Sequence, residues 1–321
     1  MSASQTQKTV ISLGDLVTDL VTVIPHFPVE AGKHQHPSTV RAEPGGAGNF
    51  LIAGARLGMQ MIALGTVGDD TFGHLIVTAL GRENINTEFV VQLPGTTTTT
   101  VVVLADGQGS HVFLGSYGEG PSVTMPPSWM GAIDGSQAIF SYGYTMQDKR
   151  MADACQQALQ HAAGRGIPIF FDPGPEMART SQAQRQFVLT HSQVLLMTED
   201  EIPILAGGRT GLDAARDMLA LGPSAICIKR GSKGCVLFTR DGIYEHPGFP
   251  VVVRDTNAAG DAFAAAFIDA WLSRWEPVKL LAFANAVGAA KVRKIGSGSQ
   301  VPTIAEVQAV LDEFQADIHI E

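Results

Sequence analysis

Short apolar runs alternate with amphipathic, helix-like stretches along most of this chain. Apolar runs typical of strands cover residues 10–13, 61–67, 138–141, 167–171, 194–197, 225–228 and 235–238. Helical spacing of apolar residues predicts helices over 50–57, 75–82, 150–163, 212–219, 262–272, 278–292 and 304–314. This alternation predicts a mostly parallel sheet with helices on both faces. Ligands gather at the carboxyl ends of parallel strands, so we expect a site where Asp15, Asp172 and Lys229 follow theirs.

Two regions depart from that alternation. Residues 21–40 and 96–114 are rich in Thr and Val, with Pro, Gly and His between them, which predicts antiparallel strands. Asp106-Gly107 between two such runs is a hairpin signal. Two interpretations stay open: an edge hairpin of the main sheet, and a small β lid over the site.

Composition narrows the function classes. The chain has 321 residues, is 45% hydrophobic and 17% charged, and no repeat or linker divides it. Its formal net charge of -9, without any Lys/Arg-rich run, argues against a nucleic-acid partner. No apolar run approaches the ~18 residues of a membrane span, and the polar start lacks a secretion signal. We therefore expect a cytoplasmic protein with no membrane partner.

The most informative segment, residues 255–263, reads DTNAAGDAF in one-letter code and leads into an apolar helix. Small residues at a helix start let its unpaired N–H groups approach an anion, which the helix dipole also attracts. Asp261 beside such an anion suits a general base that takes a proton from an attacking hydroxyl. The alternative is an ordinary capping turn. The pattern predicts a phosphoryl-transfer site.

This segment resembles the signature DTxGAGDxF of the PfkB, or ribokinase-like, carbohydrate kinases, with Ala258 where most members have Gly. The resemblance extends to residues 44–49, 65–73 and 228–234. It implies a ribokinase-like three-layer α/β/α sandwich with a mostly parallel central sheet and a small β-stranded lid. It further implies one kinase domain over residues 1–321, with lid segments at about 20–42 and 96–115.

The resemblance also implies an activity, namely ATP-dependent transfer of the γ-phosphate to a hydroxyl of a sugar, in particular a primary hydroxymethyl. The implied catalytic residues are Asp261 as general base, with Gly260, Ala259 and Ala258 as the anion site. Asp19, Gly45, Gly46 and Asn49 would bind the substrate, and Lys229, Gly231, Gly234 and Asn285 the nucleotide. Glu201 would hold Mg²⁺ through water, and Asp255 with carbonyls of residues 291–299 would bind K⁺.

The acceptor is less constrained by the sequence. Ala47 stands where many sugar-phosphate kinases of the family have Lys, and the lid offers only Lys33 and Arg41 as cations. These features favour a neutral sugar or a nucleoside. Phe113 and Tyr117 suit either stacking on the substrate or packing within the hairpin.

Three other interpretations remain open. One is a nucleoside kinase of the same family, and another is a non-catalytic sugar or nucleotide sensor on the same fold. A third is a kinase for a vitamin-like hydroxymethyl heterocycle, which would lack the lid. The resemblance also implies a homodimer through the lid, since exposed edge strands pair readily.

Overall fold

An eight-stranded sheet forms the centre of the computed structural model, which describes residues 7–320. Its strand order is β14-β13-β12-β11-β10-β9-β1-β4, and only β13 and β14 run antiparallel to their neighbours. The strands are β1 (Thr9–Leu13), β4 (Gln60–Leu64), β9 (Ala138–Tyr142), β10 (Ile169–Asp172), β11 (Val194–Thr198), β12 (Ala225–Lys229), β13 (Cys235–Thr239) and β14 (Ile243–His246). The mostly parallel sheet predicted from the sequence is confirmed.

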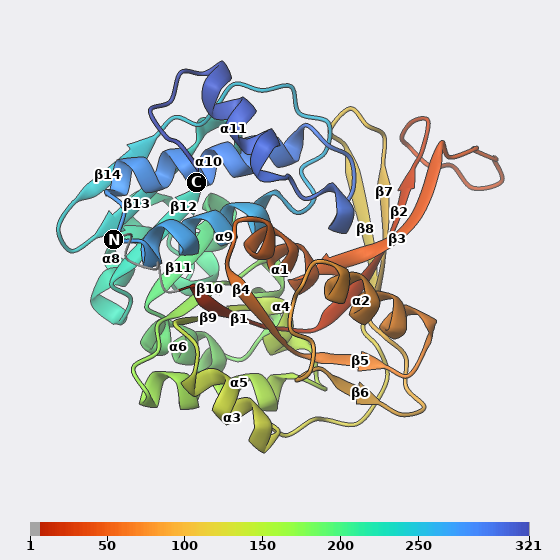
Figure 1. Ribbon diagram of the computed structural model, residues 1–321, viewed down its shortest axis with the longest axis horizontal. Coiled ribbons are helices and arrows are strands. Elements are labelled where there is room, and N and C mark those ends of the chain that lie inside the picture. The colour runs from red at the N-terminus through yellow and green to blue at the C-terminus, as the bar shows by residue number, and fades with distance from the viewer. Residues whose placement is uncertain (1–6, 321) are drawn as a thin grey trace, which may run out of the picture.

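Helices cover both faces of this sheet, which gives three layers (Figure 1). One face carries α1 (Ala47–Arg56), α2 (Thr71–Arg82), α9 (Ala259–Leu272), α10 (Pro277–Val292) and α11 (Ile304–Glu313). The other carries α3 (Pro127–Asp134), α5 (Ala152–Gly164), α6 (Gln182–His191) and α8 (Gly211–Asp217). Short helices α4 (Gly143–Gln147) and α7 (Ile202–Leu205) follow β9 and β11. Each face of the sheet has its own apolar core, which explains why the central strands read as continuous apolar runs.

A second sheet of four strands lies at one end of the molecule, at the right of Figure 1. Its order is β3-β2-β7-β8, built from β2 (Leu16–Val23), β3 (Thr39–Gly46), β7 (Thr100–Ala105) and β8 (His111–Ser116). The β7–β8 hairpin is confirmed, and it pairs with β2 rather than with the central sheet. The interpretation as an edge hairpin of the main sheet is therefore wrong.

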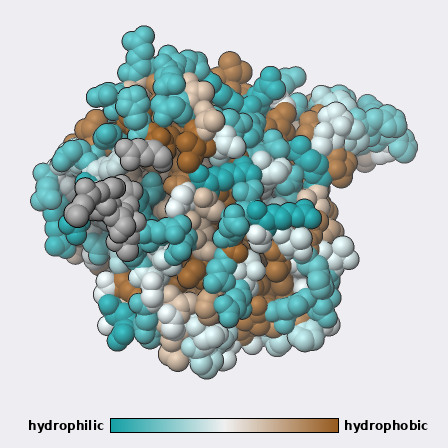
Figure 2. All heavy atoms as spheres, in the orientation of Figure 1, coloured by the Kyte–Doolittle hydropathy of each residue, from teal (hydrophilic) through white to brown (hydrophobic). Residues whose placement is uncertain are grey.

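The strand directions in the second sheet correct one expectation. β2 and β7 are parallel, whereas we expected only antiparallel pairs. Both strands run outward from the carboxyl edge of the central sheet, and β3 and β8 return beside them. The segment between β2 and β3, which projects at the right, carries mainly hydrophilic side chains on the face shown in Figure 2.

Other differences from the sequence prediction are local. The run 61–67 divides at Gly65 into β4 and β5 (Thr66–Gly68), and β5 pairs with β6 (Val91–Leu93). A Cβ at Gly65 would collide with the carbonyl oxygen of Gly14, so the chain bends there against the end of β1. Helices α3 and α6 were not predicted. No helix within residues 7–320 is long and apolar enough to cross a membrane.

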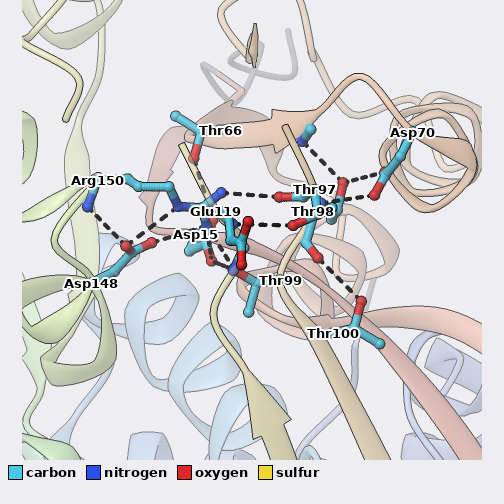
Figure 3. A network of polar contacts seen from close by, with 12 residues as sticks. Asp15, Thr66, Asp70, Thr97, Thr98, Thr99, Thr100, Glu119, Asp148 and Arg150 are labelled. Carbon is cyan, nitrogen blue, oxygen red and sulfur yellow. Dashed lines mark hydrogen bonds and ion pairs between the residues drawn. The ribbon is translucent and has the colours of Figure 1, made fainter. Parts of the chain in front are cut away.

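A buried ionic network joins the second sheet to the central one (Figure 3). Nη2 of Arg150 lies 3.1 Å from a carboxylate oxygen of both Asp15 and Asp148, and donates to the Thr99 hydroxyl at 2.7 Å. The Thr99 hydroxyl donates in turn to Asp15, and Nη1 of Arg150 donates to the carbonyl of Thr97. Burial raises the pKa of Asp15 to about 7 although Arg150 lowers it. One guanidinium thus links the end of β1, the start of β7 and the loop before α5.

Replacing Arg150 by Met should destabilise the protein by about 3–5 kcal/mol, because two carboxylates would stay buried without a counter-charge. Urea unfolding followed by circular dichroism measures this loss. The matched control is Arg165→Met, which removes an exposed ion pair with Asp134 and should cost less than about 1 kcal/mol. Equal losses in the two variants would contradict a structural role for the network.

Candidate active site

The start of helix α9 brings together two motifs that lie far apart in the sequence. Asp261 lies in the first turn of α9, and its Oδ2 accepts a hydrogen bond from Nδ2 of Asn49, in α1, at 3.1 Å. Oδ1 of Asn49 accepts from the N–H of Gly298 at 2.8 Å. Helices α1 and α9 pack side by side, which fixes this contact. The start of α1, with Asn49, therefore lies against the start of α9, with Asp261.

The residue before α9 has an unusual backbone conformation. Ala258 has φ 61°, in the left-handed region, where an L-residue costs about 1–2 kcal/mol more than glycine. This conformation turns the chain so that the first N–H groups of α9, which have no partners within the helix, point out of its start. The resemblance placed Gly at this position in most members, and the φ value gives the physical reason.

Lys229 supplies a positive charge beside that helix start. Its Nζ lies 3.4 Å from the position that a Cβ on Gly260 would occupy. The same ammonium donates to Oδ2 of Asp172 at 2.6 Å. Burial works to lower the pKa of Lys229, but the carboxylates of Asp172 and Glu201 outweigh it and hold that pKa above its usual value. Lys229 therefore carries a full charge next to the N–H groups of α9.

Asp261 itself lies in an environment that favours its protonated form. Burial raises the pKa of Asp261 to about 7, and the nearby Asp172 acts in the same direction. The Asn49 hydrogen bond and Lys229 oppose this shift. A carboxyl with a pKa close to neutral accepts a proton readily, which suits a general base.

Asp19 lies in β2 and faces the same region. Burial raises the pKa of Asp19 to about 6, while Ser297 and Asn257 beside it lower the pKa, and Asp255 and Glu43 raise it. A Cβ at Gly45 would collide with the Asp19 carboxyl. Gly46, the residue before α1, has φ 47°, a left-handed value that favours glycine. The two glycines thus leave room for Asp19 and turn the chain into α1.

Asp255 is held by backbone groups. Its Oδ1 accepts from the N–H of Asn257 at 3.0 Å and its Oδ2 from the N–H of Gly296 at 2.7 Å. The side chain of Lys291, at the end of α10, is completely buried nearby and donates to the carbonyl oxygen of Lys294 at 3.2 Å. Burial lowers the pKa of Lys291 to about 8, and Asp255 raises it.

Glu201 has a structural role in addition to the predicted one. One of its oxygens accepts the N–H of Thr198 at 2.8 Å, which closes a capping box at the end of β11. Burial raises the pKa of Glu201, as does Asp172. Within residues 7–320, no group of three or more His, Cys, Asp or Glu side chains is arranged to hold a metal ion. The Glu201 carboxylate is the type of oxygen donor that a Mg²⁺ ion held by phosphates and water would accept behind its water.

The remaining nucleotide candidates lie around the β12–β13 turn. Gly231 and Gly234 have φ 56° and 74°, and a Cβ at Gly234 would collide with backbone atoms of His246 and Gly248. Nδ2 of Asn285 donates to Sγ of Cys235 and to the carbonyl of Leu281. Asn285 therefore lies in α10 against the start of β13, and Gly234 permits the tight approach of the loop after β14.

The sequence did not reveal the side-chain contacts of three residues in this region. Asp172 was expected at the site as the end of a strand, but its ion pair with Lys229 was not. Lys291 stood in a helix that is apolar nearly throughout, and a charge in such a helix was the available signal. Ser297 had no signal at all, because a serine in a glycine-rich loop reads as a turn residue.

Known proteins resemble this chain over nearly its whole length. The profile of the pfkB family carbohydrate kinases matches residues 7–304. Ribokinase of Bacillus subtilis is 28% identical over 302 residues, covering 93% of this chain and 98% of its own. Fructokinase-2 of Zea mays is 26% identical over 321 residues, covering 94% and 93%. A solved Escherichia coli structure in complex with ATP and Mg²⁺ has a TM-score of 0.83 at 21% identity, covering 96% and 99%. The predicted sandwich with its small β lid is confirmed.

Replacing Ala258 by Gly should raise the free energy of unfolding by about 0.5–1 kcal/mol. Relief of left-handed strain gives about 1–2 kcal/mol, and the greater freedom of glycine in the unfolded chain removes part of it. Thermal and urea unfolding measure the change. The control Ala264→Gly, in the interior of α9, should lose about 1 kcal/mol or more. A destabilised Ala258→Gly variant would show that the turn is not strained.

Proposed function

This chain belongs to the pfkB family of carbohydrate kinases, which are phosphotransferases acting on hydroxyl groups, and we propose that it phosphorylates a primary hydroxyl of a neutral sugar from ATP. The observation that carries this proposal is the contact of Asp261 with Asn49 at the start of α9, with Lys229 beside it. A proton acceptor, a hydroxyl ligand and an anion site then meet at one place.

The proposed reaction uses these groups in sequence. Asp19 and Asn49 hold the acceptor through hydrogen bonds to its hydroxyls. Asp261 takes the proton of the acceptor's attacking hydroxyl, and the hydroxyl oxygen forms a bond to the γ-phosphorus of ATP. The bond between that phosphorus and the oxygen bridging it to the β-phosphate breaks, and ADP leaves. The first N–H groups of α9 and the Lys229 ammonium stabilise the charge on the transferred group. Glu201 would hold Mg²⁺ through water, and the ion would further neutralise the phosphates.

The nucleotide would lie along the β12–β13 turn. Gly231, Gly234 and Asn285 line that turn, which we propose as the binding region for the adenosine part of ATP. The second sheet would exclude water when it closes over the acceptor, and exclusion of water suppresses hydrolysis of ATP.

The neutral acceptor follows from the state of the cations in the second sheet and beside it. Lys33 pairs with Glu30 at 2.7 Å. Arg41 donates to the carbonyl of Ile295 at 3.0 Å. Arg150 is shared between two buried carboxylates. A second phosphate or a carboxylate on the acceptor would find none of these three cations without an existing partner.

A nucleoside is the second candidate acceptor, and two side chains favour it. The rings of Tyr117, after β8, and Tyr144, in α4, are 41% and 48% exposed and available to stack on a base. Phe113 is 48% exposed and its ring lies edge-on against His111 of the same strand at 4.7 Å, so stacking on the substrate and packing within the hairpin both stay open for it. The kinase of a hydroxymethyl heterocycle is disfavoured, because that interpretation required the absence of a lid. A sensor without turnover remains the contrary outcome of the assay below.

The homodimer stays a prediction. β3 and β8 are the two edge strands of the second sheet, and Val40 and Leu114 on them are exposed. Pairing of such edges between two copies is the physical reason for the expectation.

Release of ADP from Mg·ATP should occur with one member of a panel of neutral sugars and nucleosides. Asp261→Asn should reduce kcat at least about a hundredfold, because the amide cannot accept the proton. The matched control is Asp269→Asn on the same helix, which removes a carboxylate paired with Lys8 and should keep turnover. Full turnover in Asp261→Asn would exclude the general-base role, and ATP binding without turnover on any acceptor would favour the sensor.

The turnover of the wild-type enzyme should rise with pH through about 7 and then level off. Asp261 must be deprotonated to act as a base, and burial holds its pKa at about 7, so protonation below that pH removes the base. We expect kcat/KM to fall about tenfold for each pH unit below the pKa. Asp269→Asn should keep the same profile. A flat profile between about pH 5 and 8 would contradict the assignment.

A further inference from the structure

The residues beside Asp255 do not fit the potassium ion that the family resemblance implies. Both oxygens of Asp255 already accept backbone N–H groups, from Asn257 and Gly296. The ammonium of the completely buried Lys291 donates a hydrogen bond to the carbonyl oxygen of Lys294, in the loop that also contains Gly296. Carbonyls of this loop were expected to bind the potassium ion. The Lys291 ammonium, a cation of the protein itself, already binds one of them.

Electrostatics opposes a second cation here. Two unit charges ~4 Å apart repel by about 4 kcal/mol at an effective dielectric constant of ~20. A K⁺ ion would need to displace the ammonium from the Lys294 carbonyl, and α10 holds the Lys291 backbone in its last turn. The ammonium is also the only buried Lys or Arg charge that the described part of the chain places beside Asp255. The direct partners of Asp255 are the two backbone N–H groups, so the ammonium acts on this carboxylate through space.

The loop that receives the ammonium also positions the reacting groups. Lys294 is followed by Gly296, whose N–H binds Asp255, and by Gly298, whose N–H binds Asn49. Asn49 in turn donates to Asp261. A continuous chain of contacts thus connects the Lys291 ammonium with the general base that we assigned above.

We propose that Lys291 is a positioning residue whose ammonium takes the place of a bound monovalent cation behind the start of α9. The kinase would then bind ATP and turn over without K⁺. The ammonium neutralises Asp255 and fixes the loop 294–298, and this loop holds Asn49 in register with Asp261. The turnover part of this inference rests on the proposed function, whereas the effect on ATP binding does not.

The first experiment compares monovalent cations on the wild-type protein. Binding of Mg·ATP by calorimetry, and turnover with the acceptor found in the panel, are measured in K⁺, Na⁺ and tetramethylammonium salts at equal ionic strength. We expect ATP affinity and turnover to differ by less than about twofold among the three salts, because the Lys291 ammonium already occupies the place. A tetramethylammonium ion is too large to enter the loop, so it serves as the reference without a bound cation. A dependence of ATP affinity on K⁺ of about tenfold or more would overturn the proposal.

The second experiment removes the ammonium and restores a free cation. Lys291→Ala should weaken ATP binding and turnover about tenfold or more in tetramethylammonium, and K⁺ or NH₄⁺ should restore most of the loss by entering the space. Lys291→Met fills that space, so it should show the loss without the rescue. The control Lys279→Met removes an exposed charge at the start of the same helix and should change neither quantity.

The outcomes separate the proposals. Absence of ATP binding in the wild-type protein under all salts would reject the kinase proposal itself. A folded Lys291→Ala variant that matches the wild type in tetramethylammonium would reject the role of Lys291 alone. If the Lys291 variants fail to fold, as judged by circular dichroism, the salt comparison on the wild type still decides the question.

Discussion

Like charges buried close together are the constraint on which this site depends. Asp19, Asp172, Asp255 and Asp261 lie at the carboxyl edge of the central sheet or against it. Burial raises the pKa of Asp261 to about 7, and Asp172 and Asp19 act in the same direction. Burial also raises the pKa of Asp19 to about 6, and Asp255 and Glu43 add to this shift. Three of these carboxylates are offset by different contacts: Lys229 pairs with Asp172, Asn49 donates to Asp261, and two backbone N–H groups hold Asp255. The positions of Lys229, Asn49 and these backbone N–H groups therefore define the geometry of the site.

The two sheets have different roles in the proposed reaction. The central sheet and α9 would supply the anion site and the base, which must stay rigid to within a fraction of an ångström. The second sheet contains Asp19, the proposed acceptor ligand, and would cover the acceptor. Because the two sheets share no strand, the Arg150 network is among the interactions that set their relative position. The proposed substrate binding and the placement of the proposed base would therefore be coupled through buried polar contacts.

Much of the fold could be predicted from the sequence because its signals are local. Apolar runs and helical spacing located β1, β9–β13 and α9–α11 to within a few residues, and Asp106-Gly107 located the β7–β8 hairpin. Pairing directions in the second sheet could not be predicted, because β2 and β7 are parallel neighbours although β2 ends at Val23 and β7 begins only at Thr100. Helix α6 also escaped prediction, since its first half is mostly polar and its strongest signal was the Ser181–Gln184 capping box. The predicted roles of the site residues remain proposals, although Asp261, Asn49 and Lys229 do lie together.

The sequence by itself determined the family, the sandwich and the helix start at Ala258–Asp261, because short motifs carry turn geometry and charge within a few residues. Only the tertiary structure decided which distant groups meet there. It paired Lys229 with Asp172, placed Asn49 on Asp261, and enclosed Lys291 beside Asp255. Such contacts depend on strand order and helix packing, which no local pattern encodes. Burial then shifted the pKa values of the carboxyls, because desolvation is a property of the folded surroundings and not of the residue.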